Sequence, residues 1–96
     1  MPMMTPLKIR RSAPFKKDLK KAIKQKRNFK KLEAAVNLLS TKQKLSKSYQ
    51  AHSLSGYWKD YRECHIQPDW LLVYRIDKVK HELLLVRLGS HSELFK

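Results

Sequence analysis

Two apolar runs near the C-terminus constrain the fold more than any other feature of this chain. WLLVYRI, residues 70–76, and ELLLVRL, residues 82–88, are separated by only five residues, DKVKH. Short apolar runs bounded by turn-forming residues predict buried strands, and a link of this length is typical of a hairpin. A third candidate, YWKDYRECHI at 57–66, is joined to the first run by QPD. The three runs therefore predict an antiparallel meander.

Upstream of the meander, the hydrophobic pattern changes to a helical period. PLKIRR, residues 6–11, predicts a short first strand, and Ser12 is a suitable N-cap for a helix whose first turn accommodates Pro14. Asn28 is a suitable N-cap for a second helix. The expected apolar positions of the two helices are Phe15, Leu19, Ala22 and Ile23 in the first, and Leu32, Ala35, Val36 and Leu39 in the second.

The remaining segments complete the predicted architecture. Residues 41–56 have no sustained period and are expected to form a loop. Gly89 ends the last strand, and SHSELF predicts a final helical turn capped by Ser90. The order β-α-α-β-β-β predicts a single α+β domain over residues 1–96. We expect two basic helices to pack on one face of an antiparallel sheet, with a short C-terminal helical turn.

Charge is distributed very unevenly along the chain. The formal net charge is +14, and residues 1–50 hold 15 of the 22 Lys and Arg residues against two acidic residues. Such a field favours a polyanionic partner. No apolar stretch approaches the roughly 20 residues that span a bilayer, and no secretory signal is recognisable. The single cysteine, Cys64, excludes an internal disulfide and is typical of a reducing compartment. We therefore expect a cytoplasmic protein.

Four polar side chains are candidates for acid–base chemistry, because they lie where predicted strands begin or end. They are His52, His65, Asp69 and His91. In the predicted meander His65 and Asp69 flank one hairpin, and His91 follows the third strand at the same end of the sheet. His81 lies in the opposite hairpin and is set aside. A histidine of this kind is more often a surface or capping residue, so convergence of several is the feature that favours a site.

Other kinds of site find less support in the sequence. No HxH, HExxH or CxxC spacing indicates a metal site, so none is expected. Cys64 is expected to be a small core residue rather than a nucleophile. Tyr57, Trp58 and Tyr61 could stack on bases, but aromatic residues on a strand are more often part of the core, which is the interpretation that we favour.

The second half of the chain carries a specific combination of motifs. HSLSGYWKDYRECHIQPDWLLVYRI followed by LLLVRLGSHSELF closely resembles the YafQ family of bacterial toxins, within the RelE/ParE superfamily. The match runs from His52 to Phe95, whereas the first half is similar only in layout and in its lysine-rich helices. The resemblance implies a type II toxin that acts as a ribosome-dependent mRNA endonuclease.

The resemblance also implies roles for individual residues. His52, His65, Asp69 and His91 match the acid–base positions of the family. Arg87 matches a basic residue beside the scissile phosphate, and Phe95 matches an aromatic residue that positions substrate. Glu63, where relatives can carry aspartate, and Trp70 match supporting positions. The remaining expected contacts to phosphate are made by lysines of the first helix, Lys16, Lys17, Lys20 and Lys21.

This chemistry is consistent with the residue types alone. RNA carries its own nucleophile, the 2′-hydroxyl, so acid–base groups and a fixed cation suffice without a metal or cofactor. The expected partners are the 70S ribosome with its RNA and mRNA, and an acidic antitoxin, but no membrane. Two alternatives remain: a ParE-like inhibitor of DNA gyrase on the same fold, and a non-catalytic nucleic-acid-binding module. The histidines and Asp69 argue against the first.

Overall fold

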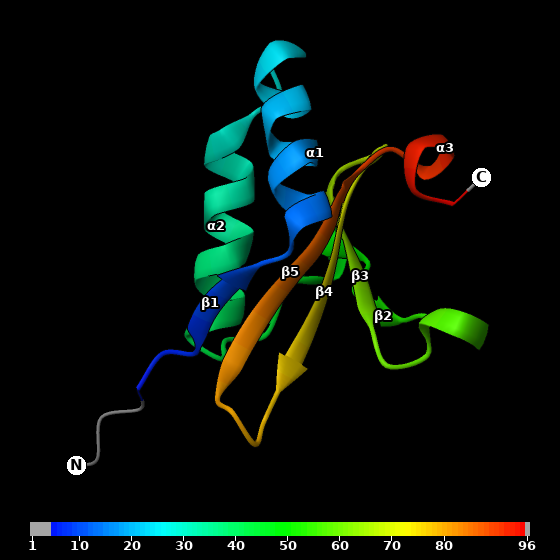
Figure 1. The fold of residues 1–96 in the computed structure, drawn as a ribbon. Helices are drawn as coiled ribbons and strands as arrows, with labels where there is room; N and C mark the ends of the chain where they lie inside the picture. The colour runs from blue at the N-terminus through cyan, green and yellow to red at the C-terminus, as the bar shows by residue number, and fades with distance from the viewer. Residues whose placement is uncertain (1–4, 96) are drawn as a thin grey trace.

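A five-stranded sheet, partly covered by two helices, organises the protein (Figure 1). The computed structural model describes residues 5–95. In chain order the elements are β1 (Lys8–Arg11), α1 (Ala13–Lys24), α2 (Phe29–Ser40), the 3₁₀ turn η1 (Lys47–Tyr49), β2 (His52–Ser53), the 3₁₀ turn η2 (Gly56–Trp58), β3 (Arg62–Gln67), β4 (Trp70–Asp77), β5 (Glu82–Gly89) and α3 (His91–Leu94). The predicted domain extends to residues 1–4 and 96, which lie outside the described residues.

The predicted meander is confirmed, but the sheet as a whole is mixed. β3, β4 and β5 pair antiparallel in succession. The strand order is β1-β5-β4-β3-β2, and β1 pairs parallel with β5. The expectation of a wholly antiparallel sheet is therefore wrong at this edge. Hydrogen bonds between residues far apart in the chain set the direction of β1. The backbone N–H of Ser12 donates to the carbonyl of Leu85, and Oγ of Ser12 donates to the carbonyl of Val86.

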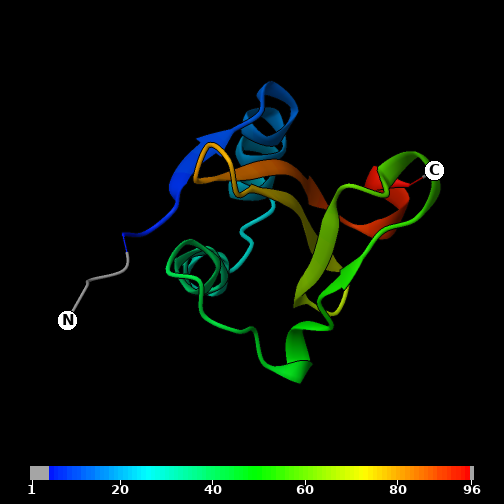
Figure 2. The same cartoon turned by 90° about the horizontal axis from the view of Figure 1, so that it is seen from below.

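The segment before β3 also differs from the prediction. A short strand, β2, lies within the predicted loop 41–56 and pairs His52 with Glu63. The run 57–66 becomes a strand only at Arg62, because η2 occupies its beginning. Gly56 adopts a left-handed conformation with φ of +64°, which suits glycine and turns the chain away from an extended path. Figure 2 shows this turn on the same side of the sheet as α3, and Figure 1 shows the two set apart along the sheet.

Both helices begin at the predicted caps and cover the same face of the sheet. Ser12 Oγ accepts a hydrogen bond from the N–H of Phe15, and Asn28 Oδ1 accepts one from the N–H of Lys31. Their buried side chains join those of the strands in one core cluster, which includes Phe15, Ala22, Leu32, Ala35, Leu39, Cys64, Trp70, Leu72, Tyr74, Leu83 and Leu85. Ile23 does not belong to this cluster. It is 59% exposed, so the prediction that it packs on the apolar side of the first helix was wrong.

The face opposite the helices carries a row of residues across four strands. The register pairs His52 with Glu63, Glu63 with Val73, and Val73 with Arg87. Directly paired residues project to the same face of a sheet, so these side chains lie in one line. A register shift between Val73 and Tyr74 marks an irregularity next to Arg87.

None of the helices within residues 5–95 is long and apolar enough to cross a membrane.

Candidate active site

Glu63 lies at the centre of a cluster of imidazoles. Its side chain is only 5% exposed, and Oε2 lies 2.9 Å from Nε2 of His52. The other oxygen, Oε1, is 3.8 Å from Nε2 of His91 and, among the described residues, has no hydrogen-bond partner. The second ring nitrogen of His52, Nδ1, is 2.8 Å from the carbonyl oxygen of Gln50. A buried carboxylate therefore orients one imidazole and faces a second.

Asp69 and His91 meet at the same end of the sheet, as the meander predicted. The backbone N–H of His91 donates to Oδ1 of Asp69 at 3.2 Å, and Nδ1 of His91 is 3.5 Å from the same oxygen. Both side chains are open to solvent, 68% and 57% exposed respectively. The ring of His65 lies 5.9 Å from that of His91, and its Nδ1 is 3.3 Å from the carbonyl oxygen of Pro68. Contacts through Glu63 and His91 thus connect the four predicted residues in one cluster.

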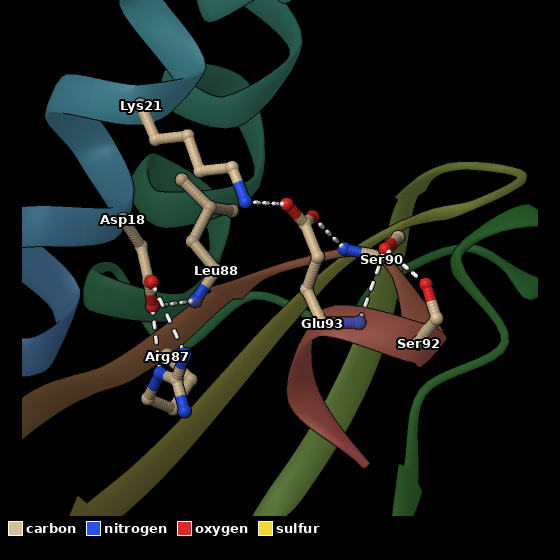
Figure 3. A network of polar contacts seen from close by, with 7 residues as sticks. All are labelled: Asp18, Lys21, Arg87, Leu88, Ser90, Ser92 and Glu93. Atoms are coloured by element: carbon tan, nitrogen blue, oxygen red, sulfur yellow. Dashed lines mark hydrogen bonds and ion pairs between the residues drawn. The ribbon is translucent and has the colours of Figure 1, made fainter. Parts of the chain in front are cut away.

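Helix α3, which carries His91, is anchored at its N-terminus and from α1 (Figure 3). Ser90 Oγ accepts a hydrogen bond from the N–H of Glu93, and Oε1 of Glu93 accepts one from the N–H of Ser90. The other carboxylate oxygen of Glu93 pairs with Nζ of Lys21. The hydrogen bond from Lys21, followed by that from the Ser90 backbone, lowers the pKa of Glu93 to about 2. Lys21, expected to contact phosphate, therefore has an intramolecular partner.

Asp18 holds Arg87 against the edge of β5. Nε and Nη2 of Arg87 donate to the two carboxylate oxygens at 2.8 and 3.2 Å, and the N–H of Leu88 donates to the same carboxylate at 2.9 Å (Figure 3). The hydrogen bond to Asp18 raises the pKa of Arg87 above its usual range, so the guanidinium remains charged. Within residues 5–95 no hydrogen bond involves Nη1, which leaves its donors for a ligand.

The two predicted aromatic residues occupy different environments. Trp70 is 1% exposed and lies in the core, with its ring 6.2 Å from that of Phe29. Phe95 is half-buried at the rim of the site. Its ring centroid lies 6.2 Å from that of His91 and 6.3 Å from that of Trp58. We expected Tyr57, Trp58 and Tyr61 in the core, but Tyr57 is 91% exposed and the other two are only half-buried, so that expectation was wrong.

The structure also bears on two other kinds of chemistry, a thiol nucleophile at Cys64 and a metal site. Burial, followed by the neighbouring charge of Glu63, raises the pKa of the Cys64 thiol to about 12. A thiol of this kind stays protonated and is a poor nucleophile, in agreement with its expected core position. Across residues 5–95, no group of three or more His, Cys, Asp or Glu side chains is arranged to hold a metal ion.

A groove of about 880 Å³ opens on one side of His65. Lys30 and Lys31 at the start of α2 lie on one wall, and Ser46, Ser48 and Gln50 contribute hydroxyl and amide groups. Lys16, Lys17 and Lys20 are exposed along α1. The groove beside His65 thus carries cations from α2, and α1 carries exposed cations of its own.

Sequence reasoning missed the roles of Asp18 and Glu93. Both connect α1 to the segment that carries the site, Asp18 through Arg87 and Glu93 through Lys21. One signal for Asp18 was present: it is the only acidic residue in the lysine-rich stretch 13–24. The signal for Glu93 was its spacing from Ser90, because a Ser followed three residues later by Glu is a capping box. Neither signal identifies the partner, which is Arg87 on β5 for Asp18 and Lys21 on α1 for Glu93.

Fold and site together define a small basic α+β domain with an acid–base cluster at one end of its sheet. A family model, described as bacterial toxin of type II toxin-antitoxin system, YafQ, matches residues 7–96. The chain therefore belongs to the YafQ family of bacterial toxins. The match includes α1 and α2, so the relationship extends well beyond the motifs of the second half.

Individual relatives agree with this assignment. The mRNA interferase toxin YafQ of Escherichia coli strain K12 is 38% identical over 86 residues, which span 88% of this chain and 90% of the relative. The crystal structure of a metal-bound toxin from Helicobacter pylori is 52% identical, with a TM-score of 0.88 over 93% of this chain and 99% of that one. The toxin in the E. coli DinJ–YafQ toxin–antitoxin complex is 35% identical, with a TM-score of 0.85 over 95% and 99%.

Proposed function

We propose that the protein is an mRNA interferase, the toxin of a type II toxin–antitoxin pair, and that it cuts mRNA while it is translated on the ribosome. The observation that carries this proposal is the convergence of three histidines, Glu63 and Asp69 at one end of the sheet. The name of the E. coli relative, an mRNA interferase toxin, supports the reaction class. The site operates in the cytoplasm, where translated mRNA is found.

The reaction needs only proton transfers and stabilisation of charge. A general base takes the proton of the 2′-hydroxyl, and the 2′-oxygen attacks the adjacent phosphorus. The bond from phosphorus to the 5′-oxygen breaks, and a general acid protonates that oxygen. The products are a 2′,3′-cyclic phosphate and a 5′-hydroxyl end. Acid–base groups contribute about 10²–10⁴-fold, and positioning by the ribosome supplies much of the remaining acceleration.

Asp69 and His91 are the proton-transfer pair in this proposal. Both are exposed at the opening of the site, and their contact of 3.5 Å allows one group to respond to the charge of the other. Either can be the base and the other the acid. Histidine changes its protonation state near neutral pH, which suits both roles. His65, next to His91, supports the pair from the groove side.

Glu63 and His52 supply orientation rather than the first proton transfer. The carboxylate is buried and holds His52 at 2.9 Å, while its second oxygen faces His91. A carboxylate in this position fixes imidazole orientation and stabilises an imidazolium when His91 takes a proton. Glu63 is therefore a positioning residue in this mechanism.

Arg87 stabilises the charge that develops on the phosphate. Its guanidinium lies on the same face as Glu63 and His52, in the row that crosses the sheet. Asp18 fixes the orientation of the guanidinium through two donors and leaves Nη1 for a phosphate oxygen. A cation held in place before the reaction needs no reorganisation when charge develops.

Docking on the ribosome follows from charge rather than from sequence recognition. Lys16, Lys17 and Lys20 on α1 are exposed and available for ribosomal RNA, and Lys30 and Lys31 line the groove beside His65. Lysines that meet phosphate oxygens carry no base information. The same basic surface suits an acidic antitoxin segment, which folds across it and blocks docking. The DinJ–YafQ complex of E. coli supports an antitoxin partner for this chain.

Primer extension on a reporter mRNA after induction of the toxin tests this function. We expect cuts at in-frame codon positions that disappear when the start codon of the reporter is removed. A gyrase inhibitor would instead damage DNA and leave the transcript whole. A non-catalytic binding module would arrest growth equally well with His91→Ala, without cutting either nucleic acid.

A further inference from the structure

A row of aromatic rings leads from the histidines of the site to an exposed turn. The ring of His91 lies 5.9 Å from that of His65 and 6.2 Å from that of Phe95. Phe95 lies 6.3 Å from Trp58, whose ring is 5.7 Å from that of Tyr57. The row therefore begins at the acid–base cluster and ends in solvent.

The turn that carries Tyr57 is a defined structure. Gly56 adopts the left-handed φ that begins η2, and nothing lies within 4 Å of where its side chain would be. The N–H of Trp58 donates to the carbonyl of Ser55, and the N–H of Tyr61 donates to the carbonyl of Trp58. Trp58 also packs edge-to-face against Tyr61, with 5.3 Å between ring centroids. The exposure of Tyr57, 91%, is thus a property of an ordered turn.

Cations from β3, β4 and the turn itself lie close to these rings. The guanidinium of Arg75 lies 5.9 Å from the ring centroid of Tyr61. Arg62 follows directly and donates from Nη1 to Ser53 Oγ and from Nε to the hydroxyl of Tyr74. Lys59 is exposed next to Trp58. Aromatic faces beside basic groups are the combination that binds single-stranded nucleic acid.

We propose that Tyr57, backed by Trp58, is a stacking platform for a base of the mRNA just outside the cleaved step. This inference rests on the proposed function, because the strand that reaches the platform is the one whose phosphate lies at His91. The continuity of the rings with the reacting groups favours RNA over a protein partner. Every base has a face that can stack, so the platform adds affinity and position without codon preference.

Binding of a short 2′-O-methyl RNA tests the platform, because this RNA lacks the nucleophile and is not cut. The partner probe has the same backbone with abasic sites in place of the bases. Three variants are compared at low salt: Tyr57→Ala, Tyr57→Phe and, as a control, Val79→Ala. Val79 is 96% exposed in the distant turn between β4 and β5. We expect Tyr57→Ala to bind the complete RNA roughly 5- to 100-fold more weakly, and Tyr57→Phe and Val79→Ala to bind as the parent does.

The abasic probe separates stacking from phosphate contacts. It should bind the parent protein and Tyr57→Ala equally. Equal loss of affinity for both probes would show that Tyr57 acts through the backbone of the RNA or through folding, and would overturn the platform. An unchanged RNA affinity, with weaker capture of the co-expressed antitoxin by Tyr57→Ala, would assign the turn to a protein contact instead.

Cleavage of a translated reporter is measured in parallel to keep the two proposals distinct. If the parent protein cuts the reporter but Tyr57→Ala binds RNA normally, only the platform fails. If the parent protein binds bases through Tyr57 but does not cut translated mRNA, the stacking contact stands, whereas the proposed reaction fails and with it the placement of that base beside a cleaved step.

Discussion

Glu63 and His52 face each other across β3 and β2, with Oε2 of the carboxylate 2.9 Å from Nε2 of the imidazole. The pair connects the shortest strand of the sheet to the centre of the site. Because the second oxygen of Glu63 faces His91, one buried carboxylate relates two histidines that are 39 residues apart in the chain. Glu63 therefore orients His52 directly and faces His91, from a side chain that is only 5% exposed.

Replacing Glu63 with Gln should separate the effect of the carboxylate charge from the effect of the side chain's shape. The amide fills the same space and still offers a hydrogen bond, but it carries no charge to stabilise an imidazolium. A charged hydrogen bond is worth about 1.5 kcal/mol more than a neutral one, so we expect cleavage of translated mRNA to fall roughly tenfold while the melting temperature changes little. Single-turnover cleavage and thermal melting measure the two effects. A Glu63→Gln variant that cuts at the parental rate would show that the carboxylate is structural only.

Asp69 has two functions in the structure, and Asp69→Asn distinguishes them. Asn keeps an oxygen that can accept the N–H of His91, but it cannot take a proton. We expect Asp69→Asn and His91→Ala to lower cleavage by about 10²–10⁴-fold each, the usual contribution of acid–base catalysis. Stability should remain near that of the parent. If Asp69→Asn retains activity while Asp69→Ala loses it, Asp69 acts by capping α3 and is not a proton carrier.

The ion pair between Lys21 and Glu93 predicts how acid affects the protein. The pKa of Glu93 falls from 4.5 to about 2 on folding, so its stabilising effect is present above about pH 4.5 and is lost as the pH falls toward 2. Solvent around Lys21 limits the effect to about 1 kcal/mol or less. Urea denaturation at a series of pH values should show this loss in the parent protein and a flatter profile in Glu93→Gln.

Asp77 provides a matched control for the role of Glu93 in anchoring α3. Its pKa is also lowered, chiefly by a hydrogen bond from the backbone of Lys80, but it is the last residue of β4, at the turn that leads to β5 and away from α3. Asp77→Asn should leave the signals of His91 in an NMR spectrum unchanged, whereas Glu93→Gln should shift them because α3 loses its anchor. Equal spectra for the two variants would show that the ion pair does not position His91.

Much of the fold follows from local patterns in the sequence. The caps Ser12, Asn28 and Ser90 are each predicted by a side chain that satisfies nearby backbone N–H groups, and the structure contains all three. The meander is equally local, since its hairpin links are short. These features depend on residues that are neighbours in the chain, so they can be predicted directly from the sequence.

What could not be predicted depends on residues that are distant in the chain. The direction of β1 is set by its contact with β5, more than 70 residues away, and β2 exists because Glu63 lies opposite His52. The meander placed His65, Asp69 and His91 at one end, but it could not show that Asp18 engages Arg87. Pairings of this kind depend on how α1 packs against β5, which no periodicity specifies.

Docking through α1 predicts a specific dependence on salt. Each phosphate contact adds about 1 unit to the slope of log affinity against log salt. Changing Lys16, Lys17 and Lys20 to Gln should therefore weaken ribosome binding and reduce that slope by up to about 3 units. Lys78 and Lys80, exposed in the turn between β4 and β5, are the control, and their replacement should leave the slope unchanged. Equal slopes for all variants would mean that α1 is only a solvated surface.

Phe95 either stabilises the core or positions groups at the rim of the site, and variants of Phe95 can distinguish these two roles. A core phenylalanine loses about 3–5 kcal/mol of stability on truncation to Ala, but Phe95 is half-buried and its ring lies beside those of Trp58 and His91. Aromatic pairs of this kind are worth about 0.5–1.5 kcal/mol each. We therefore expect Phe95→Ala to cost little stability and to reduce cleavage sharply, because the ring positions His91 and the substrate.

Phe95→Leu completes the test, because Leu restores apolar volume without an aromatic face. If the ring itself serves the site, Leu should recover the melting temperature but not the single-turnover rate of cleavage. Recovery of both would mean that Phe95 only fills space at the end of α3. A collapse of the melting temperature in Phe95→Ala, with cleavage lost only in proportion to unfolding, would place Phe95 in the core and refute its role at the rim.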